Sequence, residues 1–210
     1  MASDSTSVVW SEETADAAPG RDVPLFYVYE WKSGGTAELA LSTTAKNYRA
    51  DAVGLTSTSI YAHVVNVGFL VWSRATPGPP QVCPGFGPTN GAGLTARTAV
   101  LYVVLAGEGV GGTGSLIRYE TDGGCPAVDG GVVLDPSGNV EDYLVTDGAN
   151  VYWVTGSGLL RRAALGGGDI ETLNTVPLTG KPSALAIDDA SVYLAAGNTI
   201  YQFRKSSESD

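Results

Sequence analysis

Short apolar runs alternate with polar turns along the chain, and no apolar stripe with a 3.6-residue period continues for three turns. The runs are five to seven residues long, rich in β-branched and aromatic residues, and bounded by Gly, Asp, Asn and Pro. Examples are FYVYEW (26–31), FLVWS (69–73), VLYVVLA (100–106), NVYWVT (150–155) and SVYLAA (191–196). The pattern predicts an all-β protein made of short antiparallel strands.

The clearest internal repeat relates the segments that begin at Tyr143 and Ala184. One offset of 41 residues matches four pairs of positions: Asp147 with Asp188, Val151 with Val192, Tyr152 with Tyr193, and Leu159 with Ile200. The same alignment places Tyr61 and Tyr102 in the position of Tyr152, so the tyrosine spacings are 41, 50 and 41 residues. The longer interval contains the Gly-rich segment 107–115, which we expect to be a lengthened hairpin tip. A shared period of this kind indicates a repeat architecture.

Within a copy the pattern indicates four antiparallel strands, with the repeated tyrosine on the second. A fifth copy opens the chain, where Asp4 and Trp10 match Asp147 and Trp153. Four strands in each period of this length are typical of a β-propeller blade. We therefore expect a single β-propeller domain of about five four-stranded units, as propeller blades repeat at this spacing. The expected units are approximately 1–45, 46–90, 91–138, 139–180 and 181–210.

The residue pattern A-x-D-x-x-x-V-Y-W, L-x-R and L-x-G-G over residues 145–167 resembles the short-repeat propellers of secreted myxobacterial and related bacterial proteins. The resemblance extends over all five units and is weakest in the first two. It implies a propeller fold, and that group carries no shared catalytic signature that could be transferred to this chain.

The two end units lack strands that a closed propeller needs. The first unit has little sequence before Asp4 for its first strand, and the fifth ends before a full fourth strand. The alternatives are a five-bladed ring with thin closure and an arc of a larger propeller. We favour the ring, because uncovered blade sides promote aggregation.

The composition argues against several classes of function. Twelve Lys and Arg against 22 Asp and Glu give a net charge of −10, which argues against nucleic acid or an anionic membrane as the main partner. One His, two Cys and one Met provide little for a His-based catalytic centre or a zinc site. No cofactor is expected.

The apolar runs, the N-terminal sequence and the composition indicate where the protein is located. No apolar run approaches the roughly 18 residues of a membrane helix, so we expect no membrane insertion. The N-terminus has no signal-peptide pattern, but few Lys and many Gly, Thr and Ser favour an exported protein. We expect a secreted, periplasmic or cell-surface location.

Cys83 and Cys125 are each followed by Pro and lie 42 residues apart, close to one repeat. One interpretation is a disulfide that joins neighbouring blades in an oxidising compartment. The alternative is two independent thiols, because the outer strands of neighbouring blades diverge.

Asp135, Asn139 and Glu141 belong to the segment DPSGNVED, which places oxygen-bearing side chains at alternate positions, as in a calcium loop. Its Gly is at the fourth rather than the sixth position. A polar connector between two units is the interpretation we favour.

Asp147 and Asp188 each precede a turn sequence, and we expect both to cap turns by accepting backbone N–H bonds. The alternative is that carboxylates at this repeat position converge on a metal at the propeller axis.

Large aromatic residues belong to the expected core. These are the repeat tyrosines Tyr102, Tyr152 and Tyr193, and the tryptophans Trp31, Trp72 and Trp153, which we expect between blades. His63 falls on a central strand, and we expect an interior packing position for it.

The leading hypothesis is a non-catalytic binding or scaffold propeller that presents a loop face to a protein or glycan. One alternative is a metal-dependent hydrolase or lyase that uses the axial channel. Another is a structural repeat segment of a larger surface protein. No pattern in the sequence predicts the oligomeric state.

Overall fold

The computed structural model describes residues 2–3, 7–13, 26–43, 50–64, 67–76, 78–86, 93–97, 99–106, 114–174, 176 and 178–205. Apart from one 3₁₀ turn (Val128–Gly130), the regular structure of these residues is antiparallel β-strand. None of the described helices is long and apolar enough to cross a membrane. The chain is an all-β protein, as the strand pattern predicts.

The first two repeat units each form a four-stranded meander. The strands of the first are β1 (Ala2–Ser3), β2 (Ser7–Glu13), β3 (Phe26–Lys32) and β4 (Ala37–Thr43). Those of the second are β5 (Ala50–Leu55), β6 (Ser59–Val64), β7 (Gly68–Ser73) and β8 (Gln81–Val82). In each sheet the strands pair in chain order.

The third and fourth units share one seven-stranded sheet because β12 (Val132–Thr146) serves both. Its first residues pair with β11 as an outer strand, whereas its last residues pair with β13 as an inner strand. Gly138, with φ +66, lies where the pairing with β11 shifts register, just before Val140, which pairs with both strands. The other strands are β9 (Leu94–Arg97), β10 (Val100–Ala106), β11 (Gly114–Glu120), β13 (Asn150–Thr155), β14 (Leu160–Ala164) and β15 (Glu171–Thr172).

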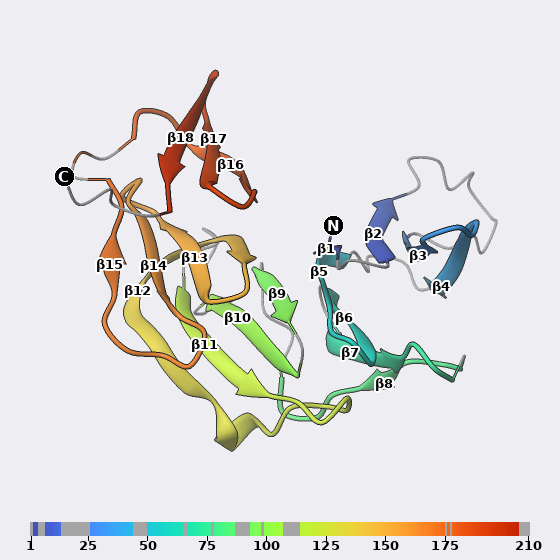
Figure 1. The fold of residues 1–210 in the computed structure, drawn as a ribbon. Helices are drawn as coiled ribbons and strands as arrows, with labels where there is room; N and C mark the ends of the chain where they lie inside the picture. Colours follow the sequence, from blue (N-terminus) through green and yellow to red (C-terminus); the bar gives the residue numbers. More distant parts are fainter. Residues whose placement is uncertain are drawn as a thin grey trace, which may run out of the picture.

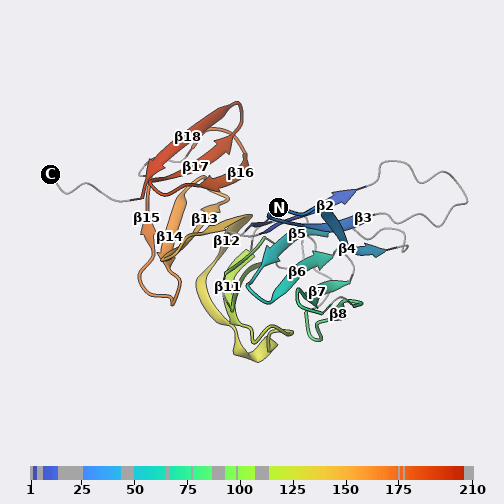
Figure 2. The same cartoon turned by 45° about the vertical axis from the view of Figure 1, so that its right-hand side comes forward.

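The fifth unit contains β16 (Pro182–Ile187), β17 (Ser191–Ala196) and β18 (Thr199–Arg204) in one three-stranded sheet. Inner strands of successive units lie side by side, with β5 beside β9, β9 beside β12, and β12 beside β16. The sheets follow one another along an arc from blue to red in Figures 1 and 2. This succession of antiparallel blades is a β-propeller architecture.

The described residues form an open arc rather than the five-bladed ring that we expected. Among the described strands, no contact like those between the inner strands of successive units joins the first and fifth units, and the two end sheets lie apart in Figure 1. Closure requires that the rotations between successive blades add up to a full turn, and no local sequence pattern encodes that sum.

The core lies between the sheets, so the central strands of the second, third and fourth units are buried on both faces. Every residue of β6 is buried, from Ser59 to Val64. On β13, Val151 and Trp153 pack toward the third unit, while Tyr152 and Val154 pack toward the fifth. Burial on both faces explains why the central strands have continuous apolar runs instead of alternation.

The strand register corrects one position of the repeat alignment. Val154 pairs with Leu160, and the matching Ala195 pairs with Ile200. Leu160, rather than Leu159, is therefore the counterpart of Ile200. The turn between the two strands is one residue longer in the fourth unit, which shifts the offset from 41 to 40.

Candidate functional site

Asp147 and Asp188 hold the first turn of their units. Oδ1 of Asp147 accepts the N–H groups of Ala149 (2.8 Å) and Asn150 (2.7 Å). Oδ1 of Asp188 accepts the equivalent N–H groups at 2.8 and 2.7 Å. The second oxygens accept the hydroxyls of Tyr152 and Tyr193 at 2.9 and 2.8 Å. Both carboxylates are thus bound by groups of their own hairpins, and both also interact with Lys205 of the fifth unit.

These bonds favour the ionised carboxylates. Burial by itself raises the pKa of Asp147, but hydrogen bonds from Ala149, Asn150, Lys205 and Tyr152 lower it to about 2. The bond from Tyr193 and those from two backbone N–H groups lower the pKa of Asp188. In the second unit Thr56 replaces the aspartate, and its Oγ1 accepts the Ser59 N–H at 3.0 Å. The repeat position therefore serves a structural turn.

Two of the repeated tyrosines, Tyr61 and Tyr102, link neighbouring units. Tyr61 donates to the Gly124 carbonyl (3.0 Å), and Tyr102 donates to the Leu165 carbonyl (2.7 Å), each in the following unit. Tyr61, Tyr102 and Tyr152 are fully buried, and burial raises the pKa of each hydroxyl. Tyr193 departs from our expectation of a core residue, because it is only partly buried. No described unit follows the fifth to cover it.

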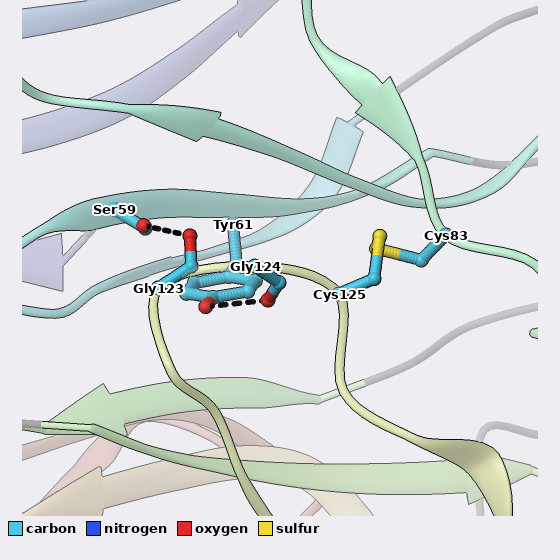
Figure 3. Close-up of a disulfide and its surroundings, with 6 residues drawn as sticks. All are labelled: Ser59, Tyr61, Cys83, Gly123, Gly124 and Cys125. Atoms are coloured by element: carbon cyan, nitrogen blue, oxygen red, sulfur yellow. Dashed lines mark hydrogen bonds between the residues drawn. A yellow bond between two sulfur atoms is a disulfide. The ribbon is translucent and has the colours of Figure 1, made fainter. Parts of the chain in front are cut away.

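Cys83 and Cys125 form a disulfide, with their Cα atoms 5.2 Å apart. Cys83 follows β8 of the second unit, and Cys125 lies between β11 and β12 of the third. Figure 3 shows Ser59 and Tyr61 reaching from β6 to this same connection, where Ser59 donates to the Gly123 carbonyl at 2.6 Å. The connection returns to the second unit, so the cysteines meet although the outer strands diverge.

Asp135 is buried and already paired, which argues against the calcium loop. Its Oδ2 accepts Trp153 Nε1–H (2.9 Å) and Arg161 (3.0 Å), and its Oδ1 accepts the Ser137 N–H (3.0 Å). Burial raises its pKa, but these hydrogen bonds prevail and lower it. Asn139 and Glu141 lie further along the same extended strand, so the three side chains do not close a loop. Among the described residues, no group of three or more His, Cys, Asp or Glu is arranged to hold a metal.

A polar link that sequence reasoning missed joins the first two units. Arg74 donates to Glu30 (2.9 Å), to Ser7 Oγ (2.6 Å) and to the Thr56 carbonyl (2.8 Å). Glu30 is 6% exposed within an apolar strand. A charged residue inside the run FYVYEW was the one available signal, because a buried carboxylate needs a cationic partner.

His63 lies on β6 and is fully buried, with its ring 5.1 Å from Phe69 in a tilted arrangement. This placement agrees with the interior packing that its strand position predicts. The side chain offers no solvent-facing group for acid–base chemistry.

One face of the fifth unit is apolar apart from Gln202, the strand partner of Tyr193, and it is uncovered by described residues. We name it the forward face; its members share one side of the sheet, as the pairs Ala186 with Tyr193 and Ala195 with Ile200 show. Ile200 is 75% exposed. The corresponding residues of the fourth unit are packed against the fifth: Val145, Tyr152, Val154 and Leu160.

The first unit has a matching uncovered face on its opposite side. This backward face contains the pairs Val8 with Trp31 and Trp10 with Tyr29. The rings of Trp10 and Tyr29 stack with centroids 5.4 Å apart. Val9, on the other side of β2, is buried toward the second unit.

Trp31 does not pack between blades as we expected. It is 38% exposed, and its Nε1 donates to the Gly35 carbonyl at 2.8 Å. No described unit precedes the first to cover it. Trp72 and Trp153 are buried between units, at 7% and 0% exposed.

Comparison with known proteins shows the fold alone. No family model and no curated protein matches the sequence. The designed protein Ika4 is similar with a TM-score of 0.57 and 13% identity, over 76% of this chain and 93% of Ika4. Virginiamycin B lyase from Staphylococcus aureus has a TM-score of 0.57 and 12% identity, over 84% of this chain and 58% of the lyase. A histidine-to-alanine variant of that lyase, solved with quinupristin, is catalytically inactive.

Glutaminyl cyclase from Myxococcus xanthus is similar with a TM-score of 0.50 and 14% identity, over 85% of each chain. The lyase and the cyclase are propeller proteins, so the fold assignment agrees with the arrangement of the sheets. The chain spans little more than half of the lyase and of the designed protein Ika8, of which 55% is covered.

Proposed function

We propose that this chain is a non-catalytic scaffold that binds protein through the uncovered sheet faces of its two end units. One observation carries the proposal: the forward and backward faces occupy the same strand positions that are buried between units in the interior of the arc. Large uncovered apolar faces are a mark of protein interaction sites. The partner protein therefore contacts the ends of the arc rather than a loop face.

The polar side chains support a structural rather than a catalytic use. Asp135, Asp147 and Asp188 accept hydrogen bonds from groups within the sheets, and Arg74 holds Glu30. The lyase loses activity when a histidine is replaced, whereas the single histidine of this chain, His63, is buried against Phe69. The alternative of an axial-channel hydrolase or lyase has no such observation in its favour.

Glycan binding is a second candidate, favoured by the aromatic backward face. Trp10 stacks on Tyr29 beside the exposed Trp31, and aromatic rings can stack on sugars. A glycan array with the wild type and Trp31→Ala separates the candidates. The scaffold proposal predicts no glycan signal that depends on Trp31; a signal that Trp31→Ala abolishes would establish the glycan alternative.

The test of the scaffold proposal uses the apolar dye 1-anilinonaphthalene-8-sulfonate in dilute protein solution. Ile200→Asp and Trp31→Asp should each remove part of the dye fluorescence, because each places a charge on one end face. Val176→Asp and Val82→Asp are matched controls, since these valines are 71% and 55% exposed but lie off both faces. Dye binding that is unchanged by both end-face variants would overturn the proposal.

A further inference from the structure

We infer that the partner of the end faces is a second copy of this chain, bound head to tail, with the forward face of one copy on the backward face of the other. This inference rests on the proposed use of the end faces. It adds the identity of the partner and the polarity of the contact.

The contact continues an interface that the molecule already repeats. In the interior, Tyr102 and Val104 of the third unit pack on Val151 and Trp153 of the fourth. Val8 and Trp10 match Val151 and Trp153 in the sequence repeat. The backward face of the first unit is therefore the same kind of surface that a forward face already accepts elsewhere in the arc.

The forward face also has a counterpart in the interior of the arc. Tyr152 and Val154 of the fourth unit pack on Val192 and Leu194 of the fifth. Tyr193 and Ala195 occupy the positions of Tyr152 and Val154 on the strand that follows. The forward face of the fifth unit thus repeats a surface whose interior copy is covered by a blade.

The two end faces also complement each other in size. The forward face has Ala186 and Ala195 where the fourth unit has Val145 and Val154. The backward face is enlarged, because the strand partners of Val8 and Trp10 are Trp31 and Tyr29. The corresponding partners in the fourth unit are Ala163 and Arg161. Small side chains on one face leave room for large rings on the other, as dense packing requires.

A contact between two different faces is heterologous, and this property makes it testable by mixing. A copy with a blocked forward face still has an intact backward face, and the reverse also holds. Two variants that are each unable to self-associate should therefore associate with each other. Contact between two like faces has no such property.

The experiment is sedimentation velocity of the full chain from dilute to concentrated solution. The wild type should show a concentration-dependent dimer or larger species, whereas Ile200→Asp alone and Trp31→Asp alone should remain monomeric. An equal mixture of the two variants should recover a dimer. Val176→Asp and Val82→Asp should associate as the wild type does. Circular dichroism checks that the variants keep their strand content, as expected for residues with exposed side chains.

Three outcomes would overturn the inference. They are a wild type that is monomeric at every concentration, a single end-face variant that still associates, and a mixture that stays monomeric. If the dye test succeeds and this experiment fails, the end faces bind a different protein and the scaffold proposal stands. If the dye test fails, both proposals fail.

Discussion

The carboxylate of Asp147 closes a turn with one oxygen and holds Tyr152 and Lys205 with the other, where Lys205 Nζ lies 3.1 Å away. The turn bonds were predictable, because an aspartate before Gly-Ala-Asn bonds to N–H groups two and three residues on. The contact with Lys205 was not, since it joins two residues that lie far apart in the sequence, in neighbouring units. Local hydrogen bonds can be inferred from sequence order, whereas contacts between units depend on how the blades stack.

The first prediction concerns the pH dependence of stability at Asp147. Its folded pKa of about 2 lies below the ordinary value of 3.8, so its contribution is present above pH 3.8 and is lost as the pH falls toward 2. Asp147→Asn should lower the free energy of unfolding by about 1–2 kcal/mol near pH 6 and by almost nothing near pH 2. Urea denaturation at both pH values measures the difference.

Asp147→Ala is the companion variant. It also removes the acceptor for two backbone N–H groups, so it should cost about 1 kcal/mol more than Asp147→Asn at either pH. Equal effects of the two variants at both pH values would show that Asp147 does not cap the turn.

A second prediction compares equivalent tyrosines in different surroundings. Tyr102 is fully buried and donates to the following unit, so Tyr102→Ala should cost about 3–5 kcal/mol. Tyr193 is only partly buried on the forward face, and Tyr193→Ala should cost about 1 kcal/mol or less, as for surface substitutions. Guanidinium denaturation of both variants measures this contrast, and similar losses would mean that a further layer covers Tyr193.

Among the elements, the central strands were the most predictable. The runs around Tyr61, Tyr102 and Tyr152 are short, β-branched and bounded by turns, and they became β6, β10 and β13. β12 was less predictable, because the boundary expected near residue 138 falls inside a continuous strand. The calcium-loop alternative for DPSGNVED lacks support for the same reason: these residues belong to β12, which pairs with two neighbouring strands.

The third prediction concerns the connection between the second and third units. The disulfide closes a segment of 42 residues, and its loss should lower the free energy of unfolding by about 2–4 kcal/mol. Cys83→Ser with Cys125→Ser tests this by urea denaturation without reductant. Wild type in reductant should match the double variant, which itself should not respond to reductant. A double variant as stable as the wild type would show that the bonds of Ser59 and Tyr61 to the connection are sufficient.

At the scale of the whole molecule, the sequence predicted the blades but not their closure. The repeat period specifies each sheet, whereas a ring depends on the rotation between sheets, summed over all units. We expected a ring because closure would bury both end faces. In the structure, however, Ile200 and Trp31 remain exposed at the two ends. The same strand positions that build the core in the middle of the arc therefore become surfaces at its ends.

Hydroxyl-radical footprinting with mass spectrometry tests the open arc most directly, at concentrations where the chain is monomeric. We expect rapid oxidation of Trp31 and Ile200, and slow oxidation of their buried counterparts Trp153 and Leu160. Urea-unfolded protein provides the reference for the intrinsic reactivity of each side chain. Protection of Trp31 and Ile200 in the dilute monomer, to the level of Trp153 and Leu160, would contradict the account, because it would mean that the first and fifth units cover each other in a closed ring.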